Sequence, residues 1–72
     1  GQFDKAIDRF KKVIEIDPQF ADGYLYLSDA YLQAGKREEA AQALEEFMTF
    51  IQDEEKKQQL EIYIEQIRNN SI

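Results

Sequence analysis

The sequence predicts an all-α domain of four helices, each antiparallel to its neighbours. Apolar residues recur at intervals of three and four in four successive segments, which is the spacing of an amphipathic helix. Proline, glycine or a polar run separates these segments, and such short turns place consecutive helices side by side. No segment alternates apolar and polar residues for long enough to form a strand. We therefore treat residues 1–72 as a single domain.

The first predicted helix spans residues 2–17. Its apolar residues form one stripe, made by Phe3, Ala6, Ile7, Phe10, Val13 and Ile14. Charged residues occupy the other side, so the stripe is the side that packs against the rest of the chain. Asp17 precedes Pro18. A residue before proline is disfavoured in the α conformation, and we expect the helix to end there.

The second predicted helix begins near Phe20 and ends at Gly35, where glycine can adopt the left-handed conformation that closes a helix. This helix is apolar on two sides. The first side consists of Tyr24, Leu27, Ser28 and Tyr31. The second lies roughly 100° further round and carries Leu25, Asp29 and Leu32, with Tyr26 at its edge. A helix with two apolar sides is expected to pack against two partners. One is the rest of this chain, and the other is either a neighbouring structural unit or a ligand.

Two further helices are predicted after Gly35. The first spans residues 36–51, and its apolar stripe consists of Ala40, Ala43, Leu44, Phe47, Met48 and Ile51. Within the polar run that follows, Asp53 is suited to cap a helix N-terminus. The second spans residues 54–69 and is expected to bury Leu60, Tyr63, Ile64 and Ile67. Because no proline separates these two helices, a fused helix that swaps between chains remains an alternative. The last four residues are expected to fray.

Composition excludes several classes of function. The chain carries 15 acidic and 9 basic residues, and this net charge of −6 argues against nucleic acid or an anionic membrane as the partner. No apolar run is long enough for membrane insertion. The chain has no histidine and no cysteine, so nucleophile–base catalysis and zinc binding lack their usual side chains. We expect no enzymatic activity, no cofactor and no metal, and a cytoplasmic location.

The sequence matches itself at an offset of 34 residues. Gly1 matches Gly35, Ala6 matches Ala40, and Phe10 aligns with Leu44. This offset is the period of the tetratricopeptide repeat, and the chain resembles that family's pattern of W-x₂-L-G-x₂-Y…A-x₃-F…P. The residues that match the pattern in the complete repeat are Tyr24, Leu27, Ser28, Tyr31, Ala40 and Leu44. The half-repeat before it supplies Ala6, Phe10 and Pro18.

The resemblance implies the helical hairpins of an α-solenoid. Residues 2–17 would be the second helix of a truncated repeat, residues 20–51 one complete repeat, and residues 54–69 a terminal capping helix. The chain would then be a fragment of a longer array. Two residues depart from the family pattern: Phe47 is large where a small residue is usual, and Gln52 replaces the proline.

The resemblance also implies a non-catalytic scaffold that binds a peptide or helix of a partner protein in a concave groove. The groove residues that it implies are Asp22, Leu25, Tyr26, Asp29, Leu32 and Gln33. No basic residue occurs between Lys12 and Lys36, so we expect a basic or apolar partner rather than an acidic one. In the alternative interpretation, Leu25 and Leu32 only contact the helix of an adjacent repeat.

A second hypothesis is a structural module that forms homo-oligomers. The resemblance implies that the helix before residue 2 is missing, which would leave part of the first helix uncovered. We expect Phe3, Ile7 and Phe10 to form a self-association edge, with the last helix contributing. Salt should strengthen this association, because each copy carries a net charge of −6.

Overall fold

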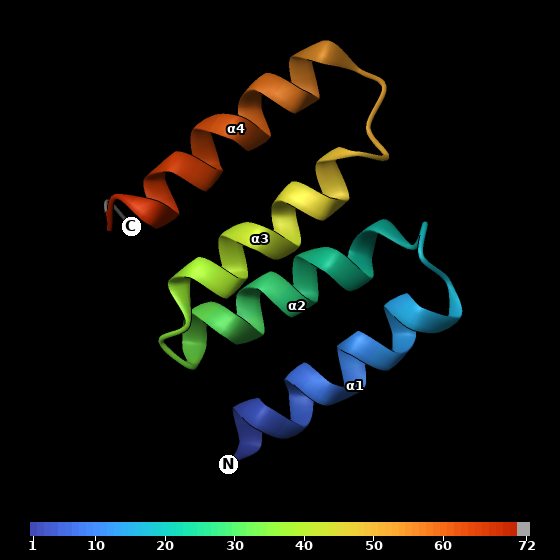
Figure 1. Cartoon of the computed structure of the whole chain (residues 1–72), viewed down its shortest axis with the longest axis vertical. Coiled ribbons are helices and arrows are strands. Elements are labelled where there is room, and N and C mark those ends of the chain that lie inside the picture. Colours follow the sequence, from blue (N-terminus) through green and yellow to red (C-terminus); the bar gives the residue numbers. More distant parts are fainter. Residues whose placement is uncertain (71–72) are drawn as a thin grey trace.

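The computed structural model describes residues 1–70, which form four α-helices in a single layer (Figure 1). The helices are α1 (Gln2–Ile16), α2 (Ala21–Gln33), α3 (Arg37–Met48) and α4 (Glu54–Arg68). Among them, backbone packing joins only helices that are consecutive in sequence. The layer measures 35 × 29 × 12 Å, so its thickness is about that of one helix with its side chains. The structure confirms the all-α class and the four antiparallel helices.

The first two turns form where proline and glycine occur in the sequence. Asp17 leaves the helical conformation with φ −134° and ψ 86°, one residue before Pro18. Gly35 adopts φ +79°. This left-handed residue lets the backbone N–H of Lys36 donate to the carbonyl oxygen of Tyr31 at 2.8 Å, which closes α2.

The third turn separates α3 from α4. α3 ends at Met48, three residues before the end that the sequence predicts. Asp53 then caps α4, because its Oδ1 accepts from the backbone N–H groups of Glu55 and Lys56 at 3.0 and 3.5 Å. The two helices are therefore distinct, and the alternative of one fused helix is wrong. Of the last four residues, Ser71 and Ile72 lie outside the described part of the chain, so the expected fraying cannot be assigned to them.

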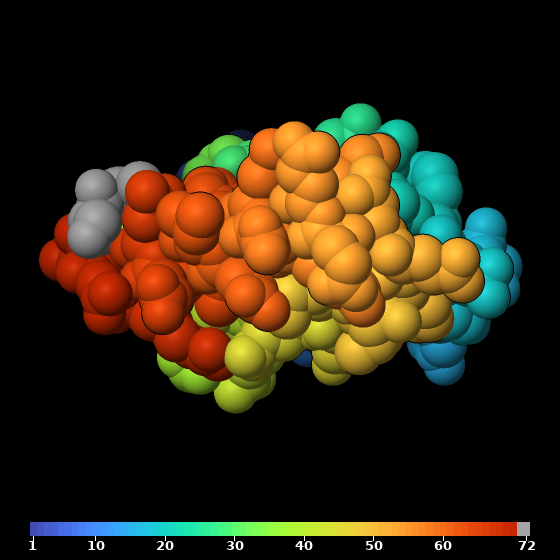
Figure 2. Space-filling view, turned by 90° about the horizontal axis from the view of Figure 1, so that it is seen from above, coloured from blue at the N-terminus to red at the C-terminus, as the bar shows by residue number. Residues whose placement is uncertain are grey.

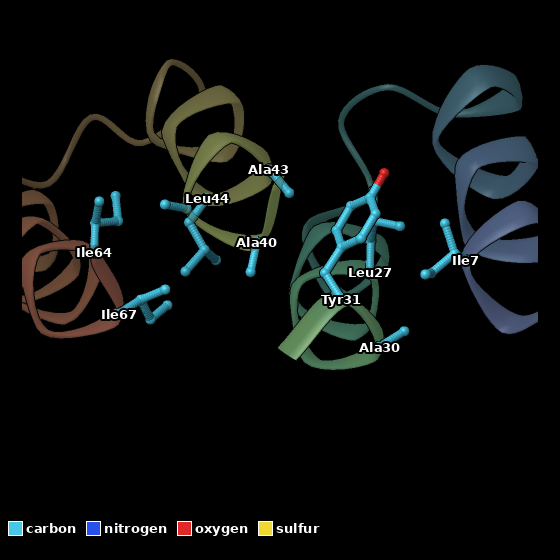
Figure 3. Close-up of a cluster of buried hydrophobic side chains, with 10 residues drawn as sticks. Ile7, Leu27, Ala30, Tyr31, Ala40, Ala43, Leu44, Ile64 and Ile67 are labelled. Atoms are coloured by element: carbon cyan, nitrogen blue, oxygen red, sulfur yellow. The ribbon is translucent and has the colours of Figure 1, made fainter. Parts of the chain in front are cut away.

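The core is a row of small and branched side chains that passes through all four helices (Figure 3). Ala40, Ala41 and Leu44 of α3 are fully buried, with 0% of their surface exposed. On one side of α3, Leu27 and Tyr31 of α2 lie between it and α1. On the other side, the remaining core residues come from α4, namely Ile64 and Ile67. Each helix therefore buries apolar side chains against its sequence neighbours.

Two residues differ in burial from what the sequence predicts. Tyr63 was expected in the core but is 39% exposed. The side of α4 that meets α3 is filled by Ile64, Ile67 and the half-buried Leu60, which leaves the Tyr63 ring beside the contact instead of within it. Ile7 was expected on an open edge but is 5% exposed, because it packs into the core cluster with Leu27.

Arg68 fixes the end of α4 to α3. Its guanidinium donates to Glu38 at 3.1 and 2.9 Å and to Glu45 at 2.9 and 2.8 Å. The neighbouring Arg37 donates to the backbone carbonyl oxygen of Ile67 at 3.4 Å. Viewed edge-on to the layer, α4 lies across the outer side of α3 (Figure 2).

Candidate functional site

The exposed side of α2 is the first candidate site. Five of the six groove residues inferred from the sequence are exposed, and Leu32 is half-buried. Leu25 is 44% exposed and Tyr26 is 54% exposed. The buried residues of α2 are Gly23, Tyr24, Leu27, Ser28, Ala30 and Tyr31. Because the buried residues occupy one arc of the helix, the six groove residues share the remaining arc. We call them the α2 face.

Contacts to α1 and within α2 orient part of this face. The ring of Tyr26 lies 5.5 Å from the ring of Phe10 in α1, measured between centroids. The side-chain amide of Gln33 donates to Asp29 at 2.7 Å. The α2 helix contains Asp22 and Asp29 and no basic residue. The α2 face is therefore apolar and negatively charged, with Leu25 between the two carboxylates in sequence.

A pocket of about 520 Å³ lies between the end of α3 and the first half of α4. Its apolar lining consists of Phe47, Ile51, Leu60 and Tyr63. Its polar lining consists of Gln52, Asp53, Lys56 and Gln59. We call it the α3–α4 pocket. Sequence reasoning assigned these apolar residues to helix packing and missed the pocket, although the large Phe47 was a departure from the family pattern.

Aromatic rings connect the α3–α4 pocket to α2. Tyr24 stacks on Phe47, which lines the pocket, with ring centroids 5.9 Å apart and planes inclined by 13°. Its centroid also lies 5.8 Å from that of Phe50. Burial, with a smaller contribution from the nearby Glu46 carboxylate, raises the pKa of the Tyr24 hydroxyl. Tyr24 therefore stays neutral at physiological pH and forms a rigid apolar wall between α2 and α3.

The expected self-association edge on α1 is only partly exposed. Phe3 is 44% exposed and Phe10 is half-buried, whereas Ile7 is in the core. The repeat offset allows a comparison within the chain. Leu44, the equivalent of Phe10, is completely buried because α2 and α4 pack on either side of α3. The side of α1 that faces away from α2 has no such cover within residues 1–70.

Polar groups offer no further site in the described part of the chain. Within residues 1–70 no three carboxylates come together in a way that could hold a metal ion. Every buried side-chain nitrogen and oxygen atom described there has a hydrogen-bond partner. None of the helices described is long and apolar enough to cross a membrane.

Comparison with known proteins identifies a family. A family model described as tetratricopeptide repeat matches residues 1–56. This range contains α1, α2 and α3 and extends to Lys56 in the first turn of α4. No curated protein and no solved structure matches the chain.

Proposed function

The chain belongs to the tetratricopeptide repeat family, and from this membership we propose that it is a non-catalytic scaffold that holds a peptide or helix of a partner protein on the α2 face. The repeat is one that generally mediates protein–protein interaction. Within this chain, α2 packs between α1 and α3 and still leaves a third side open. The α2 face is therefore presented on a rigid element.

The exposure of Leu25 and Tyr26 carries this proposal. These two consecutive residues leave about half of each large side chain in water, whereas the other apolar residues of α2 are buried or half-buried. Covering such a pair excludes water from apolar surface, which favours binding. Asp22 and Asp29 flank the pair and attract a positively charged partner. An apolar peptide with Lys or Arg residues fits this surface best.

Selection from a phage library of random peptides tests the proposal. We expect the chain to enrich peptides that combine apolar and basic residues, relative to an unrelated helical protein used as bait. Leu25→Lys should abolish their binding, because it places a charge in the apolar contact and repels basic peptides. Ile16→Lys is the matched control, since Ile16 is 85% exposed at the end of α1 and lies outside the α2 face. No enrichment, or equal binding by both variants, would contradict the proposal.

A second candidate function is self-assembly through α1, favoured by the incomplete cover of that helix. Phe3 and Phe10 supply the exposed apolar area, and Ile7 is left out because it is already buried. Sedimentation at increasing salt should show dimers or larger species, since salt screens the charge of −6 on each copy. Phe3→Lys with Phe10→Glu should return the chain to a monomer with its helix content retained. A monomer at all salt and protein concentrations would rule this function out.

A further inference from the structure

The α3–α4 pocket lies on the same side of the layer as part of the α2 face. Tyr26 contacts Phe10 of α1, so it marks the α1 side of the face. Leu25 lies about 100° away on the helix, and it follows Tyr24, which stacks on Phe47 at the wall of the pocket. Leu25 therefore lies toward α3, and an extended peptide on the α2 face can continue from Leu25 over Tyr24 into the pocket.

The pocket has the composition of a binding site for one large apolar group. Its volume of about 520 Å³ falls in the range of about 300–1,000 Å³ that is usual for ligand sites. Four apolar side chains form its walls, and the amides of Gln52 and Gln59 can hydrogen-bond to a peptide backbone. Of the four walls, Leu60 also packs against the core cluster, and the fully buried contact between α3 and α4 is made by Leu44, Ile64 and Ile67.

Charge around the two surfaces sets the direction of a bound peptide. Lys56 and Asp53 both line the pocket, so their charges offset each other and the pocket gives a basic residue little net attraction. Asp22 and Asp29 on the α2 face have no basic neighbour within α2 and favour one. The apolar group of a peptide is thus drawn to the pocket, and its basic residue is drawn to α2.

We propose that the α3–α4 pocket anchors one large apolar side chain of the bound peptide, and that a Lys or Arg of the same peptide pairs with Asp22 or Asp29. This inference rests on the proposed function and names the class of partner, a short peptide with an apolar anchor next to a basic residue. It also assigns a role in binding to Tyr63, which was expected from the sequence to lie in the core but is exposed.

The experiment measures fluorescence anisotropy with the most enriched peptide of the phage selection, synthesised with a fluorescein label. Tyr63→Ser should weaken its binding about tenfold, because one wall of the apolar pocket is lost. Ile62→Ser is the matched control. Ile62 is the adjacent residue of α4, is 57% exposed, and does not line the pocket, so its removal should change affinity less than about twofold.

A second variant guards against loss of folding. Gln59 is exposed at the rim of the pocket, so Gln59→Trp fills the pocket without removing a core side chain. It should also weaken binding about tenfold while circular dichroism shows unchanged helix content.

A double variant tests the role of the charges. Asp22→Asn with Asp29→Asn should weaken binding about fivefold at low salt and remove most of its salt dependence. As a control, Glu39→Gln with Glu46→Gln removes the same amount of charge from another groove, which is lined by residues of α1, α2 and α3. This variant should have little effect on binding.

The outcomes separate this inference from the proposed function. If peptides bind and Leu25→Lys abolishes binding, but Tyr63→Ser and Gln59→Trp bind as tightly as the parent chain, the pocket is not the anchor and the α2 face remains the site. If acidic peptides are enriched, or the double variant Asp22→Asn with Asp29→Asn binds more tightly, the assigned partner chemistry is wrong. If no peptide binds, both proposals fail. Loss of binding in both pocket variants, with Ile62→Ser unaffected, supports the inference.

Discussion

Small side chains determine how closely α2 and α3 approach each other. Ser28 occupies the position where the family pattern has glycine, and its buried hydroxyl donates to the carbonyl oxygen of Ala40 at 3.3 Å. The hydroxyl can be buried here because it has this partner. Ala40 itself is 0% exposed, so no space remains for a longer side chain. Residue size at these two positions therefore sets the packing of the hairpin.

Ala40→Leu should destabilise the chain by about 1–3 kcal/mol, because the added atoms must displace neighbouring core side chains. Urea unfolding followed by circular dichroism measures this change. Ala6→Leu is the matched control, since Ala6 is the equivalent residue one repeat earlier and is only half-buried. The added side chain can point to solvent at Ala6, so the loss there should be smaller. Equal losses at the two positions would contradict this prediction, because the loss would then not depend on the difference in burial.

The attachment of α4 depends on local signals at both of its ends. At the N-terminus of α4, the Asp53 side chain accepts hydrogen bonds from two backbone N–H groups that have no partner within the helix. At the C-terminus, Arg68 joins two glutamates of α3. No proline separates α3 from α4, so the break between them relies on other signals. They help to explain why the structure contains two helices in place of one.

Asp53→Ala should lower stability by about 1 kcal/mol, the usual effect of losing a helix N-cap. Thermal unfolding by calorimetry or circular dichroism measures it. Asp53→Asn should retain most of the stability, because an asparagine oxygen accepts the same bonds. An alanine variant with the same melting temperature as the parent chain would show that the cap does not stabilise α4.

Arg68 should make the stability of the α3–α4 pair sensitive to acid. Its hydrogen bonds and charge lower the pKa of Glu38 and of Glu45 from the ordinary value of 4.5. A carboxyl group whose pKa is lower in the folded state contributes stability above its unfolded pKa, and that stability is lost as the pH falls through the folded pKa. We therefore expect this contribution to be complete near neutral pH and to be lost progressively as the pH falls from about 4.5 through the lower pKa values of the folded state.

Arg68→Ala tests this dependence. Urea midpoints between neutral pH and about pH 3 should fall less steeply in the variant, because its glutamates have lost the partner that lowers their pKa. The effect should shrink in salt, since the cluster is at the surface. Lys57→Ala is the control: Lys57 has one ion pair, to Glu54 at 3.7 Å. A pH profile of Arg68→Ala that runs parallel to that of the parent chain would contradict this assignment.

For the whole molecule, a single layer of helices means that each helix depends on its sequence neighbours for cover. α3 is buried on one side by α2 and on the other by α4. On its exposed side α4 carries the polar residues Gln58, Glu61 and Glu65 together with Ile62, which is 57% exposed. Removing α4 would therefore uncover one whole side of α3.

Deletion of residues 54–72 should make the chain aggregate or lose helix content. It exposes Leu44 and Ala41, which are fully buried in the complete chain, and Met48, which packs against the core. Contiguous exposed apolar surface of this kind favours self-association. Light scattering and circular dichroism check the outcome. A truncated chain that stays monomeric and fully helical would show that α4 is not needed as a cover.

Local sequence was sufficient to predict the four helices and most of their ends. Gly35 and Pro18 restrict the backbone through their own covalent geometry, and Asp53 acts on N–H groups two and three residues away. The repeat offset identified the family, because residues that pack identically recur at identical spacing. The resemblance to the family implied which residues of α2 form its exposed face, and the helical period places those six residues on one arc.

Tertiary structure alone decided the burial of Ile7, the exposure of Tyr63 and the existence of the α3–α4 pocket. All three lie on apolar stripes that periodicity assigns to packing. Which member of a stripe is covered depends on how two helices are set against each other, and that is determined by side chains distant in sequence. Ile64 and Ile67 seat α4 against Leu44, and Arg68 holds its end at Glu38 and Glu45. In that arrangement the Tyr63 ring lies beside the buried contact and lines the open pocket.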